Sequence, residues 1–221
     1  MITPTMTALE AVRDARQDLR ALVHKVLPIC KRQEHKHRKE RDRKCLLQTR
    51  MAWRSPRGNN WLLVLSTNKH ETTVSSLAWY RGTDLRLRAV QPNLATTDTL
   101  YYSAHLLERY VQRFDPGRDP MQRLQDFFFA NHHAVRQPLR ELGNGKWEVM
   151  TGLYHGLATG EHDSATGLTT LTTFLDYGML GAEQQVLADY LDFLREMHTY
   201  PKGFREHVLR LIEEDKRKRA A

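Results

Sequence analysis

The chain has 221 residues, of which 40% are apolar and 27% carry a charged side chain. This composition is enough for a core, and the length allows one large domain or two small ones. No apolar run reaches the roughly 18 to 20 residues needed to cross a bilayer, and the first residues lack the pattern of a signal peptide, so we expect a cytoplasmic protein. The two cysteines, Cys30 and Cys45, are too few for a disulfide framework, and we expect both to be reduced thiols.

The net charge of +8 is concentrated in one segment. Residues 31–44 hold eight basic and three acidic side chains, which gives this segment +5 and leaves +3 for the other 207 residues. A local cluster of this kind favours a partner that carries phosphate groups, and the alternative is a solvated helix face. The basic residues of this segment that we expect to contact nucleic acid are Lys36, Arg38, Lys39, Arg41 and Arg43.

Residues 7–29 are predicted to form an amphipathic helix, because apolar residues recur there at helical spacing. Pro28 is expected to kink or end this helix. The residues that follow are polar as far as Cys45, so they have no apolar face to bury. We therefore predict an N-terminal helix with a projecting basic arm over residues 1–44 and a single α+β domain over residues 45–221.

The pattern changes to strands after the basic segment. Four runs rich in β-branched, aromatic and leucine residues are separated by short turn-like sequences, which fit antiparallel neighbours rather than helical crossovers. We expect a four-stranded meander whose run Trp61–Leu65 is buried on both faces. In the last strand Arg86 and Arg88 alternate with apolar residues, which adds two cations to one surface and to the expected nucleic-acid contacts. The predicted strands are Cys45–Trp53, Trp61–Thr67, Thr73–Tyr80 and Leu85–Val90.

The remaining elements are predicted from periodicity in the same way. The expected helices are a central helix over 100–114, a second over Pro120–Asn131 with residues 132–137 as an extension, and two more over Glu183–Met197 and Phe204–Ile212. The segments Lys146–Thr159 and Leu168–Tyr177 are expected to form a hairpin. The predicted fold class is α+β, with an antiparallel sheet, made of the meander and the later hairpin, packed with helices and followed by a helical C-terminus.

The central helix carries the set of residues that most suggests chemistry. His105, Arg109 and Arg113 follow one another at four-residue spacing, so they stack on one side of the helix, away from its apolar stripe. Stacked like charges repel each other, and that cost is easier to understand if an anion lies opposite them. The alternative is that the two arginines pair with nearby acids and the column is only a surface feature.

Such a column has parts that metal-free RNA cleavage needs. An imidazole can move a proton near neutral pH, while a guanidinium can bind phosphate and stabilise developing charge. His105 would then act as acid or base, and the candidates for the second proton-transfer group are Tyr102, Glu108 and Tyr110. His155 lies in a predicted strand where it can face the central helix.

The run from Tyr102 to Arg113, followed by a β-hairpin that ends in Leu171-Thr172-Thr173-Phe174, resembles a known signature. It is similar to the His-x-x-x-Arg-x-x-x-Arg pattern of small bacterial toxin ribonucleases of the RelE and BrnT type. In that group a helix with such residues packs on an antiparallel sheet, and RNA is cleaved without a metal. The resemblance covers residues 100–177 and implies that His105, Arg109 and Arg113 act on RNA.

Four other residues suggest a metal site. Cys30, His35, His37 and Cys45 are ligand types for zinc, but their spacing matches no standard finger, and the two histidines would point to different sides of a helix. The sequence contains no phosphate-binding glycine loop, no dinucleotide fingerprint and no Gly-x-Ser-x-Gly elbow. We therefore expect no metal and no cofactor.

Two function classes remain, with RNA a more expected ligand than DNA. One is a metal-independent ribonuclease, which requires His105 and Arg109 to border a cleft. The other is a nucleic-acid-binding protein without catalysis, which requires a continuous basic surface and salt-dependent affinity. A further alternative is a protein–protein interaction, as in a mobile-element accessory factor or a homo-oligomer, through the N-terminal helix.

Overall fold

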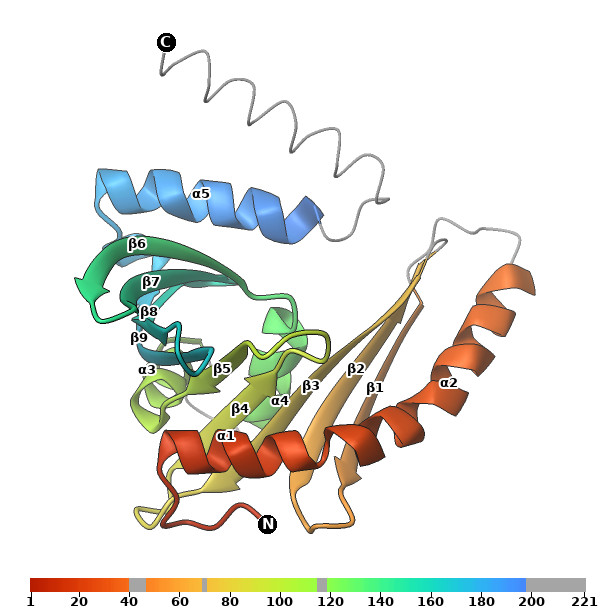
Figure 1. Ribbon diagram of the computed structural model, residues 1–221. Coiled ribbons are helices and arrows are strands. Elements are labelled where there is room, and N and C mark those ends of the chain that lie inside the picture. The colour runs from red at the N-terminus through yellow and green to blue at the C-terminus, as the bar shows by residue number, and fades with distance from the viewer. Residues whose placement is uncertain (40–46, 69–70, 115–118, 198–221) are drawn as a thin grey trace.

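The computed structural model describes residues 1–39, 47–68, 71–114 and 119–197. Within them a nine-stranded sheet has the strand order β1-β2-β3-β4-β5-β9-β8-β7-β6, with helices on both faces (Figure 1). Strands β5 and β9 are parallel and the other neighbours are antiparallel, which confirms the α+β class. The elements are α1 (Ala8–Gln17), α2 (Leu19–Lys39), β1 (Leu47–Arg54), β2 (Asn60–Thr67), β3 (Thr72–Arg81), β4 (Leu87–Pro92), β5 (Thr99–Tyr102), α3 (Ala104–Phe114), α4 (Pro120–Asn131), β6 (Val135–Gly143), β7 (Lys146–Leu153), β8 (Gly156–Asp163), β9 (Leu168–Asp176), a 3₁₀ turn (Tyr177–Met179) and α5 (Ala182–Met197).

The first four strands form the predicted meander. Strand β2 lies between β1 and β3, and its run from Trp61 to Leu65 is fully buried. Leu62 packs in the apolar cluster under α3 and α4, whereas Leu63 packs in the cluster under α1 and α2. Both faces of β2 are therefore covered, which explains why this strand is apolar throughout instead of alternating.

The central helix is shorter than predicted, because Thr99–Tyr102 forms strand β5 instead of its first turn. The strand pairs with β4 on one side and with β9 on the other. Helix α3 begins after Ser103, whose hydroxyl accepts a hydrogen bond from the backbone N–H of Leu106 at 3.2 Å and so caps the helix. The predicted apolar stripe is confirmed, since Leu106, Leu107 and Tyr110 are buried.

The second half of the sheet has four strands where the sequence predicted a hairpin. The segment Lys146–Thr159 is not one strand but folds into β7 and β8, with a turn at Tyr154 and His155. Residues 135–143 form β6 rather than an extension of α4. Strand β6 is at the sheet edge, where Pro138 is tolerated because its missing N–H breaks no interior ladder.

Helices cover the two faces of the sheet in separate layers (Figure 1). Helices α3 and α4 pack on one face, where Phe127 from α4 and Phe174 from β9 are buried in the largest cluster. Helices α1 and α2 cover the other face of the meander over Trp61. Helix α5 covers that same face over the second half of the sheet, where Leu191 meets Leu157.

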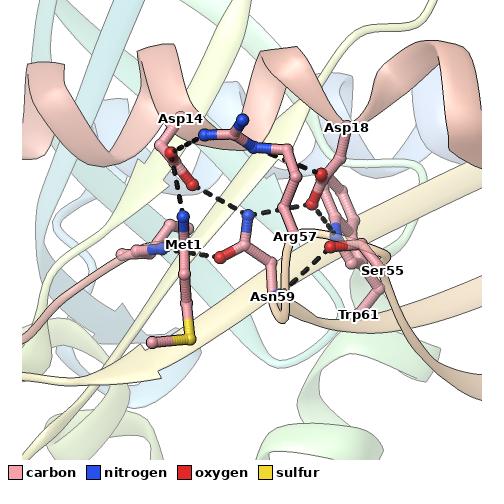
Figure 2. A network of polar contacts seen from close by, with 8 residues as sticks. Met1, Asp14, Asp18, Ser55, Arg57, Asn59 and Trp61 are labelled. Carbon is pink, nitrogen blue, oxygen red and sulfur yellow. Dashed lines mark hydrogen bonds and ion pairs between the residues drawn. The ribbon is translucent and has the colours of Figure 1, made fainter.

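The N-terminal helical region is two helices rather than one, because a buried polar network holds the chain at Asp18 (Figure 2). Asn59 donates from Nδ2 to Asp14 Oδ2 at 2.9 Å and to Asp18 Oδ2 at 2.8 Å. Trp61 Nε1 donates to Asp18 at 3.0 Å, and Arg57 donates to Asp14 at 2.6 Å. Burial alone would raise the pKa of Asp14, but hydrogen bonds from Asn59, Arg57 and the N-terminal amine lower it below its ordinary value.

Helix α2 runs through Pro28 without ending there. Pro28 is exposed, so water can reach the carbonyl that loses its hydrogen bond. The basic end of the helix was predicted to project, but α2 packs on the sheet as far as Gln33, and His37 one turn later is also buried. Gln33 contacts the hydroxyls of Thr49 and Thr67, and this fixes the helix against the ends of β1 and β2.

The C-terminal part is confirmed as far as it is described. Helix α5 matches the predicted helix, although Val186 of its expected apolar stripe is exposed. The predicted helix over Phe204–Ile212 lies outside the described residues. No helix in the described ranges combines the length and apolar character that a membrane span requires.

Candidate functional site

The sheet divides into a fork between β3 and β4. The two strands pair over four residues, from Ala78 opposite Val90 to Arg81 opposite Leu87. From there back to Thr72, β3 continues beside β2, while β4 continues beside β5. The fork leaves a stretch of strand edge that faces no neighbouring strand of the sheet.

A cavity of about 520 Å³ lies at the fork, and we call it the fork pocket. It is lined by β3, by the segment from the end of β4 to β5, and by the residues that follow α4. Its volume is in the range of small-ligand sites. Within the described residues the buried hydroxyl of Ser76 has no hydrogen-bond partner, and Ser76 lines this pocket. The polar side chains that can contact a ligand in the pocket include Glu71, Ser76, Gln91, Asp98, His133 and Arg136.

Arg136 is the fixed cation of the fork pocket. Its Nη1 donates to His162 Nδ1 at 2.7 Å and to the Thr169 hydroxyl at 2.6 Å, and its Nη2 lies 3.9 Å from Asp98 Oδ2. A guanidinium has no acceptor, so Nδ1 of His162 must accept and the ring proton lies on Nε2. Burial and the charge of Arg136 lower the pKa of His162. Arg136 is thus held beside a neutral imidazole.

A row of cationic and flat side chains leads to the pocket across the face that carries α4. We define the cationic–aromatic strip as Gln48, Arg50, Phe129, His132 and His133. The guanidinium of Arg50 lies 4.8 Å from the ring centre of Phe129, and the rings of His132 and His133 are 4.1 Å apart. Nδ1 of His132 donates to the carbonyl of Phe129 at 2.9 Å, and burial lowers the pKa of His132. Its ring therefore favours the neutral form.

The wall between the strip and the core is fixed by two hydrogen bonds. The hydroxyl of Tyr102 donates to Gln91 Oε1 at 2.7 Å, and Gln91 Nε2 donates to the carbonyl of His132 at 3.1 Å. Burial raises the pKa of Tyr102, so its phenol remains a proton donor. Tyr102 therefore supports the fork pocket instead of lying beside His105 on the exposed face of α3, as the sequence suggested.

The predicted column of His105, Arg109 and Arg113 lies on α3 as expected, with His105 and Arg109 exposed. Arg113 forms an ion pair with Asp176 and contacts Met179. Neither the fork pocket nor a second cavity between α3 and α4 is lined by these three side chains. RNA cleavage by this column stays a prediction.

The candidate partners of the column have other contacts. Glu108 forms an ion pair with Arg86, and the hydrogen bond from Arg86 lowers its pKa. Tyr110 is buried, and its hydroxyl lies 2.6 Å from Nδ1 of His155. His155 therefore contacts the central helix, as its position allowed, but it does so from the turn between β7 and β8 and not from within a strand. The structure does not bring Tyr102 and Tyr110 to the exposed face of α3, because both rings pack in the core.

The two arginines predicted at the last strand of the meander do not form a free basic surface. Arg86 lies in the turn before β4 and binds Glu108, whereas Arg88 lies in β4 and binds Asp84 at 2.8 Å. The hydrogen bond from Arg88 lowers the pKa of Asp84 to about 2. Both positive charges are thus matched by carboxylates.

The other predicted basic residues lie at the end of α2 or beyond it. Lys36, Arg38 and Lys39 are exposed in the last turn of that helix. Arg41 and Arg43 lie outside the described residues. The structure places Lys36, Arg38 and Lys39 at the basic end of α2, and their contact with nucleic acid stays a prediction.

The suggested zinc ligands are only partly described. Cys30 is a free thiol and His37 is buried, while Cys45 lies outside the described residues. In the ranges that the structure covers, no group of three or more His, Cys, Asp or Glu side chains is placed to hold a metal ion.

Sequence reasoning missed the fork pocket, because its lining comes from segments that are far apart in the chain. His132 and His133 fall in the predicted extension of the second helix, where adjacent residues point to different sides. The turn after α4 instead brings both rings to one cavity. No local pattern marks Arg136, whose partner His162 lies 26 residues away.

Comparison of the chain with protein-family models, with curated proteins and with solved structures finds no match. The fork pocket and the cationic–aromatic strip are the structural features that bear on function.

Proposed function

We propose that this protein binds single-stranded nucleic acid, RNA in the first place, and holds one nucleotide in the fork pocket. The observation that carries this proposal is the direct continuation of the cationic–aromatic strip into a polar cavity of nucleotide size. A strip alone would suggest a surface contact, and a cavity alone a small molecule. Their junction favours a ligand with a repeating backbone and flat bases.

The strip supports binding of a single strand. Proteins hold single strands by stacking bases on flat side chains and by placing cations along the backbone. Phe129 is packed against the core and the guanidinium of Arg50 lies over its ring, so the pair offers a flat cation to a base or a phosphate. The half-buried ring of His133 continues the row toward the pocket. Bases and phosphates would therefore meet suitable groups in alternation.

The pocket supports binding of a nucleotide. At 3.9 Å, Nη2 of Arg136 is too far from Asp98 for a hydrogen bond, so its donors can turn to a phosphate. The carboxylates of Asp98 and Glu71 can accept from the amino groups of a base. Gln91 and the hydroxyl of Ser76 add further polar groups for base edges or a ribose hydroxyl.

The basic end of α2 adds positive charge near the pocket, on the face of the sheet opposite the strip. Gln33 contacts Thr49 at the start of β1 and Thr67 at the end of β2. Strand β3 begins at Thr72 beside Thr67, and its first residues line the fork pocket. The exposed Lys36 and Lys39 are therefore at the same end of the meander as the pocket, where they favour a long polyanion over a single nucleotide.

Binding is tested with fluorescently labelled RNA and DNA oligonucleotides of about 12 nucleotides, a length in the range of single-strand site sizes. We expect Arg136→Gln and Arg50→Gln each to weaken RNA binding about tenfold, as loss of an important contact does. Matched controls are Arg140→Gln on the same strand as Arg136, and Arg54→Gln on the same strand as Arg50. Equal losses in variants and controls would show a diffuse charge effect and overturn the proposed site.

The salt dependence and the fate of the RNA are read in the same samples. The affinity for RNA should fall steeply between about 50 mM and about 200 mM salt. Protein binding releases counterions from the strand, and this release is less favourable at higher salt concentration. Electrophoresis of the RNA after incubation reports cleavage. Cleavage that is lost in His105→Ala, with binding unchanged, would support the column on α3 as a catalytic site, and intact RNA would support binding alone.

A further inference from the structure

A second cavity, of about 430 Å³, lies between α3, the start of α4 and the turn that precedes β4. We call it the arginine groove. It is at the opposite end of β3 and β4 from the fork pocket, since it includes Arg81 and Leu87 while the fork pocket includes Thr73 and Gln91. Its lining is largely aliphatic and consists of Leu85, Leu87, Ala104, Leu107, Val111 and Pro120, with polar residues around them.

The turn at one side of the groove presents a leucine to solvent in a strained conformation. Leu85 is 72% exposed and has a φ of 60°, in the left-handed region that β-carbon-bearing residues rarely adopt. Its N–H donates to the carbonyl of Gly82 at 2.9 Å, and its own carbonyl accepts from Arg81 at 2.9 Å. Hydrogen bonds thus hold the turn although the left-handed backbone of Leu85 lowers the stability of the fold. Backbone strain of this kind is frequent at ligand sites.

The rim of the groove is positively charged. Its described residues include the arginines Arg81, Arg86 and Arg123 and the carboxylate Glu108, which is paired with Arg86. Within the described part of the chain Arg81 contacts no carboxylate, and its guanidinium is exposed next to Leu85. An aliphatic floor with a cationic rim is complementary to a ligand that carries both aliphatic groups and carboxylates.

We propose that the arginine groove docks an acidic, aliphatic segment of a partner protein. Leucine, isoleucine or valine side chains of that segment would contact Leu85 and the floor, while its Asp or Glu residues would face Arg81. The described residues of the groove lining include no aromatic side chain, and an aliphatic floor does not favour the base stacking by which single-stranded nucleic acid is bound.

The substitution Leu85→Asn should weaken peptide docking without destabilising the fold. In Leu85→Asn the apolar side chain is removed, while asparagine tolerates the left-handed conformation better than leucine. We expect this variant to be as stable as the wild type or more stable. The matched control is Leu142→Asn, which removes another exposed leucine, next to the turn between β6 and β7.

The probe is a phage-displayed library of random peptides selected on the immobilised full-length protein. We expect the enriched peptides to combine aliphatic residues with Asp or Glu and to bind Leu85→Asn and Arg81→Gln about tenfold more weakly than the wild type or Leu142→Asn. Enriched peptides that bind all four proteins equally, that are basic, or that compete with RNA would overturn the proposal. So would the absence of any enrichment over an uncoated surface.

The two sites are tested independently. Leu85→Asn and Arg81→Gln should leave RNA affinity within about twofold of the wild type, because neither residue lines the fork pocket or belongs to the strip. Arg136→Gln should leave peptide affinity unchanged for the same reason. Loss of RNA binding therefore has no bearing on the arginine groove, and loss of peptide binding has none on the fork pocket.

Discussion

Arg136 donates a hydrogen bond to Nδ1 of His162 across 2.7 Å, from the first strand of the second half of the sheet to the third. The same nitrogen of Arg136 also donates to Thr169 on the next strand. Three strands are thereby tied to one guanidinium on the inner side of the fork pocket. The imidazole must stay neutral for this bond to persist, because a protonated ring has no acceptor.

Arg136→Gln should raise the pKa of His162 toward its ordinary value of 6.5. Burial remains in the variant and continues to oppose protonation, but the repulsion from the guanidinium is lost. NMR titration of the imidazole resonances measures the change, with Arg140→Gln as a control of equal charge. An unchanged His162 pKa would mean that the two side chains are apart in solution.

Asn59→Ala should lower the free energy of unfolding by roughly 2 to 4 kcal/mol, because buried charged acceptors lose their donors. Asn59 donates to both Asp14 and Asp18 and accepts from the backbone N–H of Ile2. Urea unfolding at neutral pH measures the loss. Asn60→Ala, at the neighbouring half-buried position, is the control, and an equal loss there would contradict a special role of the network.

Acid should destabilise the protein partly through Asp14. Its pKa is lower in the folded chain than its ordinary value of 3.8, so its contribution to stability is present above that value. The contribution is lost as the pH falls through the lower, folded pKa. Asp14→Asn should therefore be less stable at neutral pH and should lose less stability on going to about pH 3. Urea unfolding across that range checks this, and a variant with the full acid dependence would contradict it.

Gly160→Ala should destabilise the second half of the sheet by about 3 kcal/mol, because an added carbon forces overpacking. A β-carbon at Gly160 would lie 2.0 Å from the carbonyl oxygen of Thr170, at the register shift between β8 and β9. Gly181→Ala is the control, since its nearest contact is at 4.0 Å. Thermal unfolding of both variants gives the comparison, and equal melting temperatures would refute the close approach.

Local patterns were sufficient for the elements that are long and regular. The meander, the helix Pro120–Asn131 and the helix before residue 198 follow from alternation or helical spacing within one segment. Burial of Trp61–Leu65 on both faces of the sheet was also predictable from the sequence, because a strand without polar residues needs two covered faces.

Short or irregular elements could not be predicted in this way. Strand β5 has four residues and runs directly into a helix, so the periodicity of α3 concealed it. Strand β6 contains Pro138 and is half exposed, which gives it no alternating pattern. The break at Asp18 carries no proline or glycine signal. It depends on hydrogen bonds from Asn59, just before β2, and from Trp61 in β2, both distant in the sequence.

The candidate site was the least predictable feature, because it depends on contacts over long sequence separations. The sequence drew attention to His105, Arg109 and Arg113 through their regular spacing on one helix. The fork pocket depends instead on where β3 and β4 stop pairing, and a register of this kind is fixed by the whole sheet.

Helix α4 begins with Pro120 and Arg123 at the arginine groove and is followed by His132 at the cationic–aromatic strip. Its twelve residues make a stiff rod about 18 Å long, buried along one side by Leu124, Phe127 and Phe128. A helix held in this way keeps a constant separation between the two cavities, so each can be filled without rearrangement of the other.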